Sequence, residues 1–311
     1  MKVLVTGGTG LLGEAVWRRL RDLGHEPIVL DLRTLRPDSG VISVAGDVLD
    51  WSGLIQTIRR YGIETIVHLA GMLTPSVRDS PLRGIRVNYE GTVQVLEAAR
   101  LENVRRVVLS SSNTVYDHGA IPGRPMKETH PVVPRSVYAT TKLAAEWTGQ
   151  NYAALYGLEF VALRLAALFG PGPSQSGVAG LWIDPLIRGL LHRGQAEVVQ
   201  PNRMQMEYVY VKDAAAALAA AAVVGHLEYP VANVGDGQLT PFVRILEILL
   251  NLIPESNITV VTERQEESLY REASDPMDFQ RANKMLGYSP QFEMPIALAD
   301  YVEQVSVDSA I

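Results

Sequence analysis

Apolar and amphipathic segments alternate through the first half of the chain. Short apolar runs predict strands, and longer stretches with apolar positions three and four apart predict helices. The expected strands are Lys2–Thr6, Pro27–Leu30, Thr65–Leu69, Arg106–Ser110 and Glu159–Leu163, with a further short apolar run at Val41–Val44. The expected helices are Leu11–Leu23, Trp51–Tyr61, Ile85–Leu101 and Ser136–Tyr156. This order predicts an α/β fold with a doubly wound parallel sheet that binds ligands at the carboxyl ends of its strands.

The second half is less regular. A loop rich in Gly, Pro and Ser spans Phe169–Gly180, and further elements are expected near Ile183–Arg193, Tyr208–Val211, Val231–Val234, Pro241–Leu252 and Ile258–Thr262. We therefore expect residues 1–168 to form the sheet domain. Residues 169–311 should form mainly a smaller substrate-binding lobe, with some segments returning to the first domain. Four prolines make Ile121–Pro134 a non-helical surface segment, and the tail Ser306–Ile311 is expected to be frayed.

The first predicted strand runs into a glycine-rich turn, Thr6–Gly13, just before a predicted helix. Gly8, Gly10 and Gly13 fit the spacing G-x-G-x-x-G, and Gly7, Gly10 and Gly13 fit G-x-x-G-x-x-G. In either spacing the glycines permit a tight turn, let the backbone approach a pyrophosphate and let the helix pack on the strand. The phosphates would meet free N–H groups at the helix N-terminus. The turn predicts a Rossmann-type dinucleotide site.

Asp31 follows the second predicted strand. A carboxylate there accepts hydrogen bonds from the adenosine ribose and repels a 2′-phosphate, which favours NAD over NADP. Arg33 is close enough to leave some use of NADP open. Asp47 and Val48 follow the Val41–Val44 run and are expected to reach the adenine.

Tyr138 and Lys142 are four residues apart on a predicted helix, so they share one face. A free tyrosine has a pKa of about 10, too high for a general base at neutral pH, and a nearby ammonium group lowers it. Ser112 closes the run Ser110–Ser112 at the end of the fourth long strand, where such a sheet exposes residues to its ligand. A hydroxyl there can hold a substrate oxygen against the tyrosine.

Together these features resemble the extended branch of the short-chain dehydrogenase/reductase superfamily, the NAD-dependent epimerases and dehydratases. The matching segments are Thr6–Gly13, Asp31, Asp47–Val48, His68–Gly71, Asn88–Thr92, Ser110–Tyr116, Tyr138–Lys142, Arg164–Gly172, Tyr208–Asp213 and Leu286–Pro290. The resemblance implies that Tyr138 is the general acid/base, that Lys142 lowers its pKa and binds the nicotinamide ribose, and that Ser112 holds the reacting oxygen.

The resemblance also implies a cofactor groove along the strand ends, with Asn88 acting partly as a structural brace. The residues expected to bind NAD are Gly7, Gly10, Leu11, Leu12, Gly13, Asp31, Leu32, Arg33, Asp47, Val48, Leu69, Ala70, Gly71, Asn88, Ser110, Tyr138, Lys142 and Leu165. The residues expected to contact substrate are Ser112, Asn113, Tyr138, Ala167, Arg188 and Met206. His68 is expected to be a packed strand residue.

Three departures from the family pattern bear on the reaction. Asn113 and Thr114 stand where dehydratases carry an Asp-Glu pair, so dehydration is not expected. Ala167 replaces an Asn that contacts substrate in sugar-nucleotide members, and Met206 replaces an Arg that grips a phosphate. Both replacements weaken diphosphate recognition, although Arg188, Arg203 or Arg271 can compensate.

Three functions follow, in order of preference. The first is an NAD-dependent dehydrogenase or reductase that acts on a secondary alcohol or ketone of a small polar, sugar-derived compound. The second is a nucleotide-sugar 4-epimerase with the same three catalytic residues. The third is a nucleotide-sensing protein without turnover, for which the intact Ser112, Tyr138 and Lys142 set would have no chemical purpose.

The composition limits the cellular locations and the classes of binding partner that are expected for this protein. The formal net charge of -6 argues against binding to nucleic acid, and the lack of cysteine excludes disulfides and thiolate chemistry. The remaining histidines show no metal-ligand spacing, so no metal is expected. The longest apolar run, Ala214–Val224, is too short to span a bilayer, and no leader pattern precedes the first strand, so a cytoplasmic enzyme is expected. The resemblance further implies a homodimer formed through Ile85–Leu101 and Ser136–Tyr156.

Overall fold

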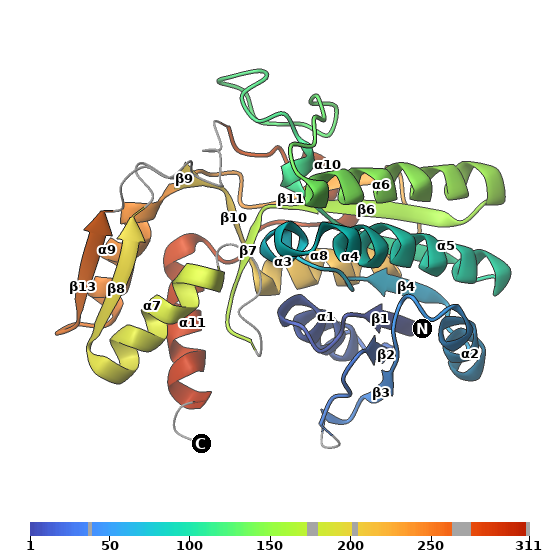
Figure 1. The fold of residues 1–311 in the computed structure, drawn as a ribbon, viewed down its shortest axis with the longest axis horizontal. Coiled ribbons are helices and arrows are strands. Elements are labelled where there is room, and N and C mark those ends of the chain that lie inside the picture. The colour runs from blue at the N-terminus through green and yellow to red at the C-terminus, as the bar shows by residue number, and fades with distance from the viewer. Residues whose placement is uncertain (37–38, 173–179, 201–204, 263–274, 309–311) are drawn as a thin grey trace.

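The computed structural model describes residues 1–36, 39–172, 180–200, 205–262 and 275–308. Its centre is a seven-stranded sheet in the order β3-β2-β1-β4-β5-β6-β11, in which every neighbouring pair is parallel (Figure 1). The strands are β1 (Lys2–Thr6), β2 (Glu26–Asp31), β3 (Ile42–Ala45), β4 (Thr65–His68), β5 (Arg106–Ser112), β6 (Glu159–Leu165) and β11 (Val231–Val234). The expected doubly wound parallel sheet is confirmed.

Helices cover both faces of the sheet, which is why its central strands are apolar along their whole length. Val3, Leu4 and Val5 of β1, for example, are fully buried. One face carries α1 (Leu11–Asp22) and α8 (Val211–Val223), whose alanine-rich sequence lets it pack closely. The other face carries α2 (Trp51–Tyr61), α5 (Gly91–Leu101) and α6 (Val137–Tyr156).

The helix expected over Ile85–Leu101 is interrupted, which corrects the sequence-based prediction. Two short helices, α3 (Thr74–Asp79) and α4 (Pro81–Ile85), come first, and a π-helical turn at Arg86–Glu90 separates them from α5. The wider turn carries Asn88 inward, where its side chain bonds the main chain of Met72. The π-helical turn thus coincides with a contact between residues 16 positions apart, and such turns are frequent at functional sites.

The segments that return to the sheet domain from the second half are α8, β11 and α10 (Gln280–Leu286). The other elements of this half lie to one side of the sheet (Figure 1). They are α7 (Gly180–Arg193), β8 (Gln195–Gln200), β9 (Gln205–Met206), β12 (Thr240–Pro241), α9 (Phe242–Leu252), β13 (Asn257–Thr262) and α11 (Met294–Asp308). β7 (Ala167–Phe169) and β10 (Tyr208–Tyr210) pair where the two parts meet.

The smaller lobe has its own apolar core. Phe242, Ile245 and Leu249 form one stripe of α9, with the spacing of an amphipathic helix, and pack with residues of α7 and α11. The prediction of a frayed tail is wrong for Ser306–Asp308, because these residues continue helix α11, in which the preceding residue Val305 is buried. Residues 309–311 lie outside the described part of the chain.

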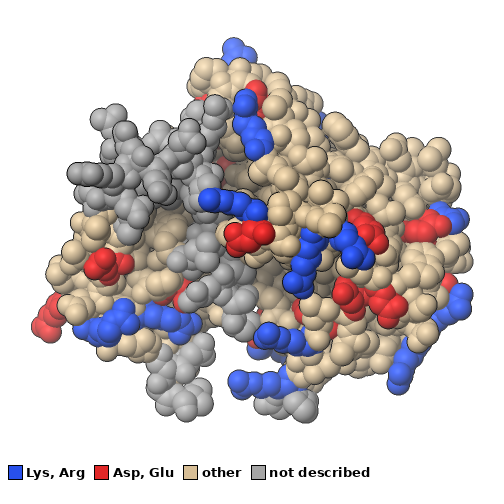
Figure 2. All heavy atoms as spheres, viewed as in Figure 1, with Lys and Arg blue, Asp and Glu red and all other residues tan. Residues whose placement is uncertain are grey.

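The segment Ile121–Pro134 contains no helix and is largely exposed, as expected, although Met126 and His130 are buried. Acidic and basic side chains are interspersed over the face shown in Figure 2. Within the described residues, no helix combines the length and the apolar character that crossing a membrane requires.

Candidate active site

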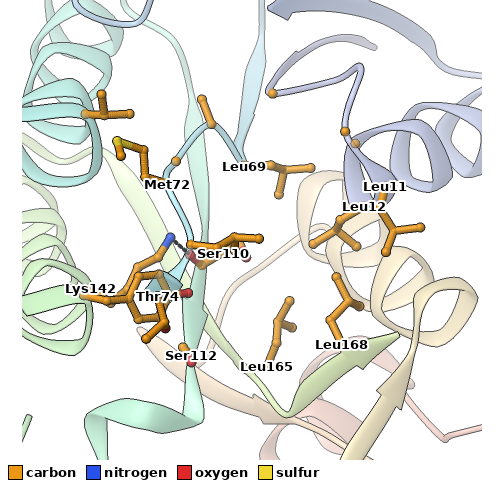
Figure 3. A pocket seen from close by; sticks show the side chains of 18 of the residues that line it. Leu11, Leu12, Leu69, Met72, Thr74, Ser110, Ser112, Lys142, Leu165 and Leu168 are labelled. Atoms are coloured by element: carbon orange, nitrogen blue, oxygen red, sulfur yellow. Dashed lines mark hydrogen bonds between the residues drawn. The ribbon is translucent and has the colours of Figure 1, made fainter. Parts of the chain in front are cut away.

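A cavity of about 1420 Å³ opens at the carboxyl ends of β1, β2, β4, β5 and β6. The glycine-rich turn lies at one wall, and Ser112, Tyr138 and Lys142 lie at another. Figure 3 shows Leu11, Leu12 and Leu168 on one side of this space and Lys142 and Ser112 on the opposite side, with Leu165 between them. The volume is sufficient for a dinucleotide together with a small substrate.

The glycine turn is shaped for close backbone approach. Gly7 has a φ of 71°, a backbone conformation that residues with a side chain rarely adopt. A Cβ at Gly13 would lie 2.2 Å from the main-chain oxygen of Gly7, so only glycine lets α1 pack on the turn. Gly10 differs, because a Cβ there meets only the Gly7 oxygen, at 3.4 Å, and would otherwise project into the cavity.

These features fit an NAD molecule. Gly10 precedes the first turn of α1, where no side chain of the described residues caps the helix, so main-chain N–H groups are available to a pyrophosphate. Asp31 ends β2 at the cavity wall and accepts a hydrogen bond from the Thr9 main-chain N–H at 3.0 Å. Its carboxylate is thereby fixed beside the turn, where an adenosine ribose would lie.

Tyr138 and Lys142 share the inner face of α6 and are both buried. The Lys142 ammonium donates a hydrogen bond to the main-chain oxygen of Ser110 at 2.9 Å and lies 5.7 Å from the centre of the Tyr138 ring. Burial raises the pKa of Tyr138 to about 12, opposed by a hydrogen bond with Ser112. Burial also lowers the pKa of Lys142 to about 8, opposed by the charge of Glu146.

The Lys142 ammonium is hydrogen-bonded to the strand end, 5.7 Å from the centre of the Tyr138 ring. Burial dominates the pKa of Tyr138, so the phenol is protonated at neutral pH when no further charge lies beside it. A phenolate at neutral pH would need a further positive charge beside it, and an oxidised nicotinamide ring carries one.

A buried ion pair lies behind the catalytic strand. Arg164 on β6 makes a two-pronged contact with Glu146 on α6, with N–O distances of 2.6 and 3.0 Å, and both side chains are almost fully buried. The Ser111 hydroxyl donates to the same carboxylate. Ser111 lies between Ser110 and Ser112. Its bond to the Glu146–Arg164 pair therefore fixes the strand segment that presents the Ser110 main-chain oxygen and the Ser112 hydroxyl to the cavity.

A second buried chain of hydrogen bonds reaches the glycine turn. The Thr6 hydroxyl accepts from the main-chain N–H groups of Leu69 and Ala70, so its own proton points to Nδ1 of His68 at 2.7 Å. Burial lowers the pKa of His68 to about 3, and the neutral ring then donates from Nε2 to Thr92. His68 is thus a packed strand residue, as expected, and not exposed to a ligand.

The cavity brings together nearly all the residues expected at the site. Asn88 does not line it, because this side chain is buried and clamps both main-chain groups of Met72. Arg188 also lies elsewhere, on α7 with a hydrogen bond to Asp184. Arg203 and Arg271, the other arginines named for a diphosphate, lie outside the described residues.

Several cavity residues were not anticipated from the sequence. Thr9, Met72, Thr74, Thr114, His118 and Glu207 all line the cavity. Thr9 and Thr114 lie inside motifs that were recognised, so their nearness to Asp31 and Ser112 was readable from spacing alone. Glu207 was not, because its burial depends on the chain around Gly237 and Met277 folding over it.

The chain shows extensive similarity to known enzymes. A family model described as the NAD dependent epimerase/dehydratase family matches residues 3–235. The UDP-glucose 4-epimerase of Mycolicibacterium smegmatis is 30% identical over 317 residues, covering 97% of this chain and 98% of that protein. The structure of UDP-glucose 4-epimerase from Thermus thermophilus with NAD has a TM-score of 0.84 at 27% identity, covering 98% of this chain and 99% of that one. MoeE5 with UDP-glucuronic acid and NAD has a TM-score of 0.86 at 26% identity, covering 99% and 100%.

These similarities confirm the expected family, the enzyme class and the use of NAD. They support the epimerase alternative more strongly than a simple dehydrogenase, because the relatives named above as 4-epimerases align over almost their full length. The matched residues include the glycine turn and the Ser112, Tyr138 and Lys142 set. The chain belongs to the NAD dependent epimerase/dehydratase family.

Proposed function

We propose that this enzyme oxidises a secondary hydroxyl of a nucleotide-linked sugar and returns the hydride to the same carbon, so that the net reaction is epimerisation. The observation that carries the proposal is the meeting of Ser112 and Tyr138 at the end of β5, in the same cavity as the glycine turn. The 4-epimerases among its relatives support the net reaction.

The residues divide the chemistry as follows. Bound NAD would supply the hydride acceptor and donor for the substrate carbon. The Tyr138 oxygen takes the hydroxyl proton as that carbon becomes a carbonyl, and gives it back when the carbon is reduced from the opposite face. Ser112 holds the reacting oxygen by a hydrogen bond, and the Lys142 charge favours the phenolate.

A second candidate is a dehydrogenase that releases its oxidised product. Ala167 and Met206 favour it, because both line the cavity and neither can bind a diphosphate by a charge or a side-chain hydrogen bond. A sugar-derived substrate without a nucleotide would fit this apolar wall better than a nucleotide sugar does.

The two candidates differ in what accumulates. Purified enzyme would be incubated with NAD and UDP-glucose, UDP-glucuronic acid or the corresponding sugar without its nucleotide, with NADH followed by absorbance and the sugar by proton NMR. Epimerisation gives a new sugar without net NADH. Free NADH formed in step with an oxidised product would instead establish the dehydrogenase, and a lack of both with every nucleotide sugar tested would overturn the epimerase.

We also propose a homodimer formed through the segments Ile85–Leu101 and Ser136–Tyr156. Large apolar side chains are exposed there: Ile85, Leu101, Trp147, Leu155 and Tyr156. Such a patch is unusual on a monomer. Light scattering should give twice the mass of one chain for the wild type and the monomer mass for Trp147→Glu; a monomeric wild type would rule the dimer out. The cytoplasmic location stays a prediction.

A further inference from the structure

Thr114 makes two hydrogen bonds to the hydroxyl oxygen of the catalytic serine. Its main-chain N–H donates to Ser112 Oγ at 3.2 Å, and its own hydroxyl donates to the same atom at 3.0 Å. Both contacts arise because Ser112 begins a short 3₁₀ turn, Asn113–Val115, directly after β5. Thr114 itself is exposed to the cavity, so its hydroxyl is not held there by burial.

The two contacts determine what Ser112 can do. A serine hydroxyl has one proton to donate and two lone pairs to accept with. Thr114 occupies both accepting positions, so the Ser112 oxygen has no capacity left to receive a substrate proton. The one remaining function is donation. Ser112 and Tyr138 line the same cavity, and a hydrogen bond with Ser112 acts to lower the pKa of the Tyr138 phenol.

The direction of this bond matters for the reaction that we propose. A donor at Ser112 stabilises negative charge on the oxygen it faces, whether that oxygen belongs to the Tyr138 phenolate or to the substrate. An acceptor at Ser112 would favour the protonated forms. Successive hydroxyl donors also polarise one another, which strengthens the last bond of the series.

We propose that Thr114 is a positioning residue that makes Ser112 an obligate hydrogen-bond donor to the reacting oxygens. The sequence Thr114 to Ser112 to Tyr138 is then a directed series of hydroxyl groups that ends at the site of proton transfer. This inference rests on the proposed function for its consequence in turnover, but the hydrogen-bond direction can be measured without a substrate.

The test measures the ionisation of Tyr138 in the NAD complex by ultraviolet absorbance of the phenolate, with Tyr138→Phe titrated in parallel to subtract the other tyrosines. Thr114→Val keeps the shape and the main-chain donor but removes the hydroxyl. It should raise the pKa of Tyr138 by about one unit, which lowers the phenolate fraction, and hence hydride transfer at neutral pH, by about tenfold. Thr114→Ser should restore both.

The matched control is Thr140→Val. Thr140 is exposed on α6 near Tyr138, and its hydroxyl bonds the Ser136 main chain, away from the reacting groups. NAD affinity should be the same in all the variants. If Thr114→Val leaves the Tyr138 titration at the wild-type position, or if Thr140→Val shifts it equally, the inference is wrong. If Thr114→Val raises the pKa of Tyr138 as predicted but the wild-type enzyme forms no epimer, only the proposed reaction is wrong.

Discussion

The Lys142 ammonium is bonded to the main-chain oxygen of Ser110 at 2.9 Å. This contact joins α6 to the end of β5 and places the Lys142 charge beside Tyr138, 5.7 Å from the centre of the ring. Glu146, one turn further along α6, favours the charged lysine, whereas burial opposes it. The charge that the proposed chemistry requires is therefore only just maintained at neutral pH.

Activity and stability should respond in opposite directions as pH rises through about 8, the pKa of Lys142 in the folded protein. Turnover should fall, because the cation is lost. The free energy of unfolding should rise between about 8 and 10.5, since the unfolded lysine still binds a proton that the folded one has released. Urea titrations across this range should show the rise in wild type and a weaker rise in Lys142→Met. An equal rise in both would contradict the assignment.

Tyr138→Phe should leave NAD affinity nearly intact, because the ring and its packing remain. Turnover should fall by a factor of about 10²–10⁴, the usual contribution of a general acid/base. Steady-state kinetics and fluorescence titration with NADH would measure the two effects. Unchanged turnover would remove Tyr138 from the reaction and favour a binding protein without catalysis.

Two glycines of the same turn should behave differently when each is changed to alanine. Gly10→Ala should keep the stability of the wild type but weaken NAD binding at least tenfold, because the new methyl group projects into the cavity. Gly13→Ala should instead lower the melting temperature, because its methyl group would lie 2.2 Å from the Gly7 oxygen. Calorimetry and NAD titration on both variants separate these outcomes. Wild-type NAD affinity in Gly10→Ala would argue against the turn as the pyrophosphate site.

Neutralising only one member of the buried Glu146–Arg164 pair should lower the stability of the protein strongly. Glu146→Gln leaves the buried Arg164 charge uncompensated and should destabilise the protein by about 3–5 kcal/mol. The double change Glu146→Leu with Arg164→Met removes both charges and should recover part of that loss. Denaturant unfolding gives both values, and a double variant less stable than the single one would show that the pair does more than balance charge.

Glu207 should make stability depend on pH in the opposite sense to Lys142. Burial raises its pKa to about 8, so the folded protein binds a proton that the unfolded chain loses near 4.5. The free energy of unfolding should therefore fall as pH rises from about 5 to 8. Glu207→Gln should flatten this slope, although it costs about 1 kcal/mol at low pH by losing one acceptor for the Met277 or Gly237 N–H. An unchanged slope would mean that Glu207 stays ionised.

The strands of the sheet could be predicted from the sequence, and most of the residues expected at the site line the cavity. β1 and α2 have the predicted bounds, β2 is one residue longer at each end, and β4 and β6 differ by one or two residues at one end. The reason is that strands buried on both faces are apolar throughout, and such a pattern is read without knowing the partners. The Thr6–Gly13 turn and the Tyr138–Lys142 spacing were equally readable, because each depends on residues close together in the chain.

Tertiary structure alone decided features whose cause lies far away in sequence. The Asn88 side chain within the π-helical turn bonds Met72, and the buried Glu207 carboxylate accepts from the main-chain N–H groups of Gly237 and Met277. The Lys142 bond to Ser110 likewise joins groups 32 residues apart. Periodicity and propensity describe neighbours along the chain, whereas burial and charge are set by neighbours in space.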